Sequence, residues 1–107
     1  MFQALLLTQD GKRTVATLAP LDDARLPSGD VTVRVEYSSL NFKDALAITG
    51  RGAIIKKWPL VPGIDLAGSV ERSDDPAWKP GDRVVVNGWG MGETDWGGLA
   101  QKARVSA

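Results

Sequence analysis

The sequence predicts a mainly β fold, a small and partly closed β-barrel with one or two short helices. Short apolar runs along the 107-residue chain are separated by Gly, Pro and Asp residues that favour turns. In the clearest run, Val31, Val33, Val35 and Tyr37 alternate with polar residues. This alternation indicates a strand with one buried face, on which we expect Tyr37 to pack in the core.

The other strands follow from the remaining runs and turns. Asp10-Gly11 is a hairpin turn signal, and Lys79-Pro80-Gly81-Asp82 matches a type II turn. Asp65 interrupts an apolar run, and we expect it to hold the fold together beneath a site, because a buried carboxylate needs partners. A Gly-rich loop over 88–98 precedes the last run. The expected strands are 1–8, 14–18, 31–37, 63–70, 83–86 and 99–105.

One segment carries helix signals directly after the third expected strand. Asn41 suits the N-cap position, and Asp44 lies three residues on, where an acidic side chain favours the free N–H groups of the first turn. Gly50 is placed to end the helix in the left-handed conformation. The sequence therefore predicts a short helix between Asn41 and Gly50.

Composition limits the classes of function. The length fits one domain, and 13 basic residues balance 13 acidic ones, so no net charge draws the chain to nucleic acid or an anionic membrane. The absence of Cys excludes a disulfide scaffold and fits a cytoplasmic protein. Residues 1–10 lack the basic segment and long apolar run of a signal peptide or membrane span. We expect a cytoplasmic protein with no nucleic-acid or membrane partner.

Five blocks of the sequence form a recognisable pattern. They are Arg25-Leu26-Pro27 with Gly29-Asp30-Val31, Ser38 to Gly50, Pro62 to Gly68, Gly81-Asp82, and Gly88-Trp89-Gly90 with Trp96 to Ala100. Together they resemble the GroES-like catalytic domain of the medium-chain dehydrogenase/reductase superfamily, over residues 1–107. Zinc-binding members need Cys and His at matching positions, and this chain has neither. It therefore resembles the zinc-free, quinone-oxidoreductase-like enzymes, and the Asn-Phe-Lys-Asp and Trp-Gly-Gly blocks favour the acryloyl-CoA reductase branch.

This resemblance implies an NADPH-dependent oxidoreductase that reduces the C=C bond of acryloyl-CoA or a similar enoyl thioester, with no metal. Hydride delivery to the β-carbon puts negative charge on the thioester oxygen, and the α-carbon is then protonated. Hydrogen-bond donors must stabilise that charge in place of zinc, and each such donor lowers a barrier by roughly 2.7–4 kcal/mol. Asn41 and the start of its helix are the best candidates.

Each residue at the start of the predicted helix has both a structural and a functional interpretation. Asn41 is an N-cap that has spare donors for the reaction or the cofactor. Phe42 is either a core aromatic or, by its position in the family, a wall beside the nicotinamide ring. Lys43 is either solvated or in contact with cofactor or substrate. Asp44, a third candidate catalytic residue with Asn41 and Lys43, is better suited to hydrogen bonding at the helix start than to acid–base work.

The candidate substrate pocket consists of Arg51, Trp89 and Trp96. Arg51 belongs to a basic group with Lys56 and Lys57 that suits the phosphates of coenzyme A, the alternative being a solvated loop. Trp89 and Trp96 either line the acyl pocket or cover one end of the barrel.

The superfamily binds its dinucleotide in a separate Rossmann domain, where a Gly-rich turn leads from a strand into a helix. Gly88-x-Gly90-x-Gly92 lacks the third spacing and leads toward another strand. We therefore expect the cofactor domain to be absent from this chain and the isolated chain to be inactive. A homodimer is a candidate assembly of the complete enzyme.

Three alternatives remain open. The first is a quinone or other enone reductase. The second is a non-catalytic GroES-like interaction module that docks on a partner through Gly52-Ala53-Ile54-Ile55. The third is a small barrel that binds nucleic acid by aromatic stacking in a basic groove, against which the balanced charge argues.

Overall fold

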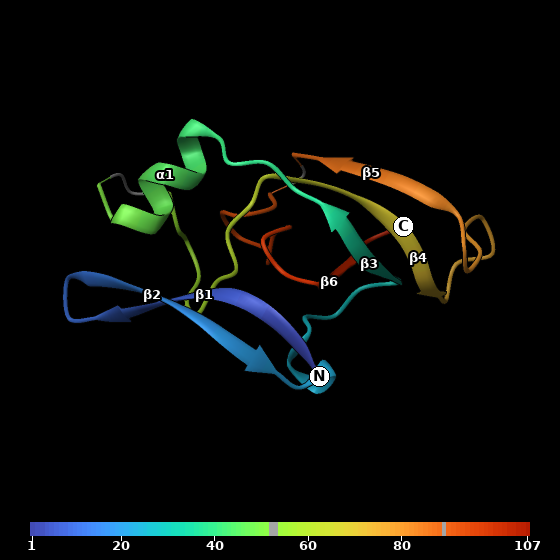
Figure 1. Cartoon of the computed structure of the whole chain (residues 1–107), viewed down its shortest axis with the longest axis horizontal. Helices are drawn as coiled ribbons and strands as arrows, with labels where there is room; N and C mark the ends of the chain where they lie inside the picture. The colour runs from blue at the N-terminus through green and yellow to red at the C-terminus, as the bar shows by residue number, and fades with distance from the viewer. Residues whose placement is uncertain (52–53, 89) are drawn as a thin grey trace.

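The computed structural model describes residues 1–51, 54–88 and 90–107. Within these residues the fold is mainly β, with one α-helix and one short 3-10 helix (Figure 1), as the sequence predicted. The elements in chain order are β1 (Phe2–Asp10), β2 (Arg13–Leu21), η1 (Asp23–Arg25), β3 (Val31–Tyr37), α1 (Phe42–Thr49), β4 (Asp65–Ser73), β5 (Arg83–Asn87) and β6 (Lys102–Val105).

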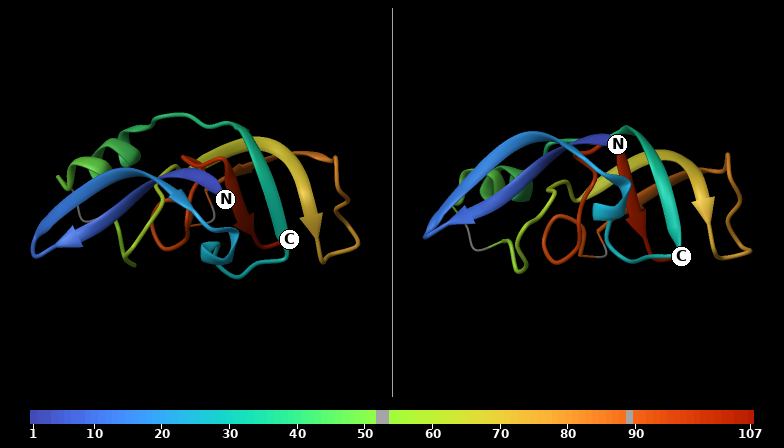
Figure 2. Two further views of the ribbon diagram at one scale, coloured as in Figure 1. Left: turned by 60° about the horizontal axis from the view of Figure 1, so that its bottom comes forward. Right: turned by 90° about the horizontal axis from the view of Figure 1, so that it is seen from below.

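The strands form two antiparallel sheets. β1 and β2 make a hairpin whose turn contains Gly11, at a φ of 62°. The second sheet has the order β5-β4-β3-β6. Isolated bridges from Ala4 to Ala100 and from Leu7 to Leu60 connect the hairpin to the rest of the chain. The two sheets do not close into one continuous ladder, and the hairpin lies to one side of the four-stranded sheet (Figure 2).

Two clusters of buried apolar residues form the core. One lies on the four-stranded sheet and contains Val31, Val33, Leu66, Val70, Met91 and Ala103. The other joins the hairpin to the loops and contains Phe2, Ala4, Leu21, Leu26 and Val61, with Trp96 packed against it. Because each cluster draws on segments far apart in sequence, burial of apolar surface fixes the positions of the intervening loops.

The prediction that Tyr37 packs in the core is wrong, because its side chain is 71% exposed. Val35 pairs with Gly68 and Tyr37 pairs with Ala67, so β3 has one extra residue at this point. Such a bulge shifts the alternation of side chains by one position and turns Tyr37 to the outside. At the other end of the strand, Thr32 is buried although the alternation placed it outside, and its Oγ1 accepts a hydrogen bond from Arg104 Nε.

Two predicted strands begin earlier in the sequence than the observed ones. The backbone at Gly63 has a φ of 109°, outside the extended region, and β4 begins only at Asp65. The predicted strand over 99–105 is observed as Lys102–Val105. The N–H of Leu99 donates to Pro62 O instead of to a strand of the larger sheet.

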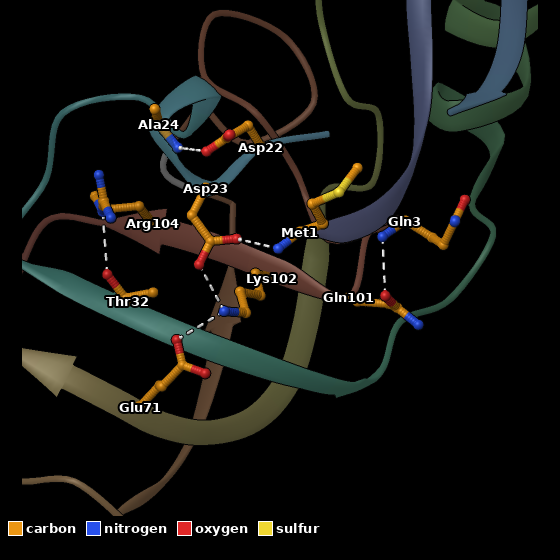
Figure 3. Close-up of polar contacts among 10 residues, drawn as sticks. All are labelled: Met1, Gln3, Asp22, Asp23, Ala24, Thr32, Glu71, Gln101, Lys102 and Arg104. Carbon is orange, nitrogen blue, oxygen red and sulfur yellow. Dashed lines mark hydrogen bonds and ion pairs between the residues drawn. The ribbon is translucent and has the colours of Figure 1, made fainter. Parts of the chain in front are cut away.

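Lys102 connects the η1 turn to the larger sheet (Figure 3). Its Nζ lies 2.8 Å from Asp23 Oδ2 and 3.2 Å from Glu71 Oε2, and the Met1 ammonium lies 3.4 Å from Asp23 Oδ1. The hydrogen bond from Lys102 lowers the pKa of Asp23, and the hydrogen bond to Asp23 raises the pKa of Lys102. The charged forms of both residues are therefore favoured by folding.

Replacing Asp23 with Asn is expected to lower the melting temperature in a pH-dependent way. Because folding lowers the pKa of Asp23, its contribution is complete above the ordinary value of 3.8 and is lost as the pH falls through the lowered value. Thermal melts of the wild type and Asp23→Asn should therefore differ at neutral pH and converge in acid. Asp74→Asn is the control, since Asp74 pairs with Arg72 on the open surface at 3.8 Å. A difference in melting temperature between the wild type and Asp23→Asn that is the same at every pH would contradict a stabilising role for the charge of Asp23.

Candidate active site

Helix α1 begins and ends where the sequence predicted. Asn41 is its N-cap and forms a capping box with Asp44, whose Oδ2 accepts a hydrogen bond of 2.9 Å from the backbone N–H of Asn41. Gly50 ends the helix with a φ of 72°, and its N–H donates to Ala47 O. These contacts fix both ends of an eight-residue helix.

Asp44 joins the start of this helix to the Pro-Gly-Ile-Asp segment. Its side chain is only 1% exposed. One carboxylate oxygen accepts from the Asn41 N–H, and the other accepts a hydrogen bond of 3.1 Å from the N–H of Gly63. These are the hydrogen-bonding functions expected of an acid in the first turn, and a direct part for Asp44 in the reaction stays a prediction.

Asp65 lies at the beginning of β4 and accepts hydrogen bonds from the segment before α1. Its Oδ1 accepts from the N–H of Ser39 at 3.1 Å, and Ser39 Oγ lies 2.9 and 2.7 Å from Oδ1 and Oδ2. The Ser38 hydroxyl donates to the backbone carbonyl of Asp65 at 2.9 Å. Asp65 therefore positions the two residues that lead into the helix, as the sequence led us to expect.

The side-chain amide of Asn41 has a defined orientation. Its Nδ2 lies 3.0 Å from Ser39 Oγ, 3.3 Å from Asp65 Oδ2 and 3.4 Å from Asp44 Oδ2. An ionised carboxylate can only accept hydrogen bonds, so the NH₂ group has to face these two acids. The sequence suggested that the side-chain N–H groups of Asn41 stabilise an oxyanion. In the structure these N–H groups instead donate to other residues of the protein.

Phe42 and Lys43 both point away from the core. The Phe42 side chain is 78% exposed and Leu40 is 70% exposed, so the core interpretation of Phe42 is wrong. Lys43 Nζ forms an ion pair of 2.8 Å with Glu93 Oε1. This hydrogen bond lowers the pKa of Glu93, and it ties the first turn of α1 to the Gly-rich loop.

The Trp-Gly-Gly block packs directly against the Pro-Gly-Ile-Asp segment. Gly97 N–H donates to Val61 O at 2.6 Å, and Gly98 N–H donates to Gly63 O at 3.1 Å. A Cβ on Gly97 would overlap Gly63 O and lie 2.6 Å from Pro62 O. Glycine is needed here because the two backbones approach each other too closely for a side chain.

Arg51 and Trp96, the proposed substrate residues that the structure describes, line different cavities. Trp96 donates from Nε1 to Pro59 O at 2.9 Å and lines a groove of about 450 Å³ on the larger sheet, together with Met91 and Arg104. Arg51 lines a separate cavity of about 330 Å³ next to the β1–β2 hairpin. Trp89, and Gly52 and Ala53 of the alternative docking loop, lie outside the described residues.

Sequence reasoning missed Ser39 and Glu93 as members of the site. A second hydroxyl two residues before the N-cap residue was a weak signal for Ser39. Glu93 lies 50 residues from its partner Lys43, so no local pattern could connect them.

The alcohol dehydrogenase GroES-like domain model matches residues 27–107, which is most of the chain. The chain belongs to this family. It is 58% identical over 103 residues to the probable acrylyl-CoA reductase AcuI of Escherichia coli, covering 96% of this chain and 32% of that protein. It is 50% identical over 109 residues to the acrylyl-CoA reductase AcuI of Ruegeria pomeroyi, covering 100% of this chain and 33% of that protein.

Solved structures support the same placement within the GroES-like family. The crystal structure of E. coli K-12 YhdH with bound NADPH matches with a TM-score of 0.95 and 57% identity, covering 98% of this chain and 32% of that one. The GroES-like chain therefore spans about a third of the length of the relatives it matches. Across residues 1–51, 54–88 and 90–107, no group of three or more acidic side chains is arranged to hold a metal ion, and no helix is long and apolar enough to cross a membrane.

Replacing Asp44 with Asn is expected to destabilise the GroES-like fold. One backbone N–H, of Asn41 or Gly63, would then face an NH₂ group instead of an acceptor. Leaving a buried donor unsatisfied costs roughly 1–3 kcal/mol, which urea denaturation would measure. Asp10→Asn, in the exposed hairpin turn, is the matched control and is expected to have no effect on the midpoint. Equal midpoints for the two variants would show that Asp44 does not hold the helix in place.

Proposed function

We propose that this chain is the GroES-like catalytic domain of a zinc-free, NADPH-dependent reductase of acryloyl-CoA or a similar enoyl thioester. The observation that carries the proposal is the helix start at Asn41, whose amide is fixed by Ser39, Asp44 and Asp65. The names of the relatives from E. coli and R. pomeroyi support the substrate. The Rossmann domain would lie in the part of those relatives that this chain does not match.

The surface next to Asn41 fits a nicotinamide ring. Phe42 and Leu40 expose apolar side chains on either side of Asn41 in the sequence, and such a surface suits one face of a flat ring. With its NH₂ group turned to the acids and one lone pair of its carbonyl oxygen engaged in the capping box, Asn41 has the second lone pair left to accept a hydrogen bond from a carboxamide or a ribose hydroxyl. NADPH would supply the hydride when bound. In this proposal Asn41 and Phe42 orient the cofactor.

Stabilisation of the thioester oxyanion then falls to the backbone at the start of α1. The first turn of a helix has N–H groups without intrahelical partners and carries a partial positive charge. The N–H groups of Phe42 and Lys43 belong to this turn. Lys43 adds a positive side chain to this turn, and an ion pair of 2.8 Å between its Nζ and Glu93 Oε1 fixes the position of that charge. Asn41 and Lys43 thus serve the reaction by placement and charge, while Asp44 serves it by holding the turn.

The proposal includes a cytoplasmic location and a homodimer for the complete enzyme. The substrate test uses the complete protein that contains this chain. NADPH oxidation at 340 nm is followed with acryloyl-CoA and, separately, with a benzoquinone. Faster turnover of acryloyl-CoA would support the enoyl-thioester reductase, whereas turnover of the quinone alone would favour the quinone reductase and overturn the proposal.

Asp65→Asn is expected to lower kcat/KM of the complete enzyme by about tenfold or more, since a hydrogen bond to a charged group contributes roughly 1.5–3 kcal/mol. The new amide can donate toward Asn41 and so releases the orientation of its side chain. The KM for NADPH should rise as well, because the carbonyl oxygen of Asn41 is no longer held toward the cofactor. Ser39→Ala removes one partner only and should give a smaller change in the same direction.

Asp30→Asn, at an exposed position away from this network, is the control for the Asp65 variant. Near-ultraviolet circular dichroism confirms that each variant keeps its tertiary packing. A folded Asp65→Asn enzyme with unchanged kinetics would contradict the positioning role of Asp65.

A further inference from the structure

We propose that the cavity between the β1–β2 hairpin turn and the end of α1 binds the phosphorylated adenosine end of coenzyme A. This inference rests on the proposed function, because it assigns a place to the part of the substrate that does not react. The cavity, which we call the hairpin cavity, has a volume of about 330 Å³ and is lined by Gln9, Lys12, Thr14, Ala47, Gly50, Arg51, Ile55 and Trp58.

Close contact between the helix end and the hairpin creates this cavity. At Gly50 a Cβ would lie 2.8 Å from Thr14 Oγ1, so the backbone of the helix end lies directly on strand β2. Lys12 lies in the hairpin turn two residues before Thr14, and Arg51 follows Gly50. The contact therefore brings two cations from distant parts of the sequence to the same cavity.

The hairpin cavity lies in a positively charged part of a chain that is neutral as a whole. The segments 9–14 and 50–58 contain five basic residues and one acidic residue, Asp10. In the part of the chain that the structure describes, no ion pair involves Lys12 or Arg51. Cations without acidic partners beside a concave surface attract anions.

The residue types in this cavity match a nucleotide with phosphate groups. Arg51 can bind a phosphate through two parallel hydrogen bonds, and Lys12 can act as a compact point charge. Trp58 offers an aromatic face on which an adenine ring can stack. Thr14 and Gln9 add a hydroxyl and an amide for the sugar or the base.

The position of the cavity along α1 also fits a coenzyme A thioester. The helix has eight residues, so its two ends lie about 12 Å apart at 1.5 Å per residue. The proposed reaction takes place at Asn41, at one end, and the hairpin cavity lies at the other. The extended pantetheine arm of coenzyme A is long enough to join the two. Lys56 connects the two regions, because its backbone N–H donates to the carbonyl of Glu93, whose side chain pairs with Lys43 in the first turn of α1.

The test compares two substrates of the complete enzyme, acryloyl-CoA and acryloyl-pantetheine, which lacks the nucleotide. In Lys12→Gln and Arg51→Gln, the KM for acryloyl-CoA is expected to rise by about tenfold, the effect of losing one charge-assisted phosphate contact of roughly 1.4 kcal/mol. The KM for acryloyl-pantetheine and kcat for both substrates should stay unchanged. The control is Lys79→Gln, an exposed lysine in the β4–β5 connection at the opposite end of the molecule (Figure 1).

Direct binding separates failure of this inference from failure of the proposed function. Adenosine 3′,5′-bisphosphate, the nucleotide end of coenzyme A, is titrated into the complete protein, with adenosine 2′,5′-bisphosphate as the probe for the corresponding end of NADPH. Loss of 3′,5′-bisphosphate binding in both variants, with 2′,5′-bisphosphate binding retained, supports the cavity even if acryloyl-CoA is not reduced. The inference would be overturned if the variants raised the KM for both substrates equally. It would also be overturned if they changed neither a KM nor the binding of adenosine 3′,5′-bisphosphate. Either result would leave the reductase proposal standing.

Discussion

The carboxylate of Asp44 is almost completely removed from solvent, and both of its oxygens accept hydrogen bonds from backbone N–H groups. One donor belongs to the N-cap residue of α1 and the other to Gly63, so a single side chain sets the distance between the helix and the segment that leads into β4. An ionised group in such a place is stable only when its hydrogen bonds are complete. The position of every candidate residue at the helix start depends on this link.

Asp65 adds a second carboxylate that orients the side chain of Asn41. Its carboxylate and that of Asp44 approach Nδ2 of Asn41 from two elements, at 3.3 and 3.4 Å. Because both acids only accept hydrogen bonds, the amide has one favourable orientation, and a rigid orientation reduces the cost of binding a cofactor. The close backbone contacts of Gly97 and Gly98 in turn hold the Gly-rich loop against the segment around Gly63.

Local patterns predicted the local parts of this structure. The cap residues of α1 and the paired runs of the hairpin can be recognised because their signals lie within a few residues of each other. Tyr37 was misplaced because a bulge depends on the partner strand, which the alternation within β3 does not reveal. The ion pair between Lys43 and Glu93 and the meeting of Lys12 with Arg51 depend on how the chain folds back on itself. No spacing in the sequence could have predicted them.

The exposed apolar side chains near Asn41 place a physical condition on any reduction at this site. Tyr37, Leu40 and Phe42 are each at least 70% exposed, and apolar groups gathered near a site usually mark a surface that a ligand or another protein surface covers. Reduction of an enoyl thioester also requires exclusion of water, since electrostatic stabilisation of an oxyanion is much stronger in a dry site. In the proposed enzyme this domain would supply one wall of such a site. The opposite wall would come from the cofactor and from the part of the proposed enzyme that holds it, which accords with relatives about three times as long as this chain.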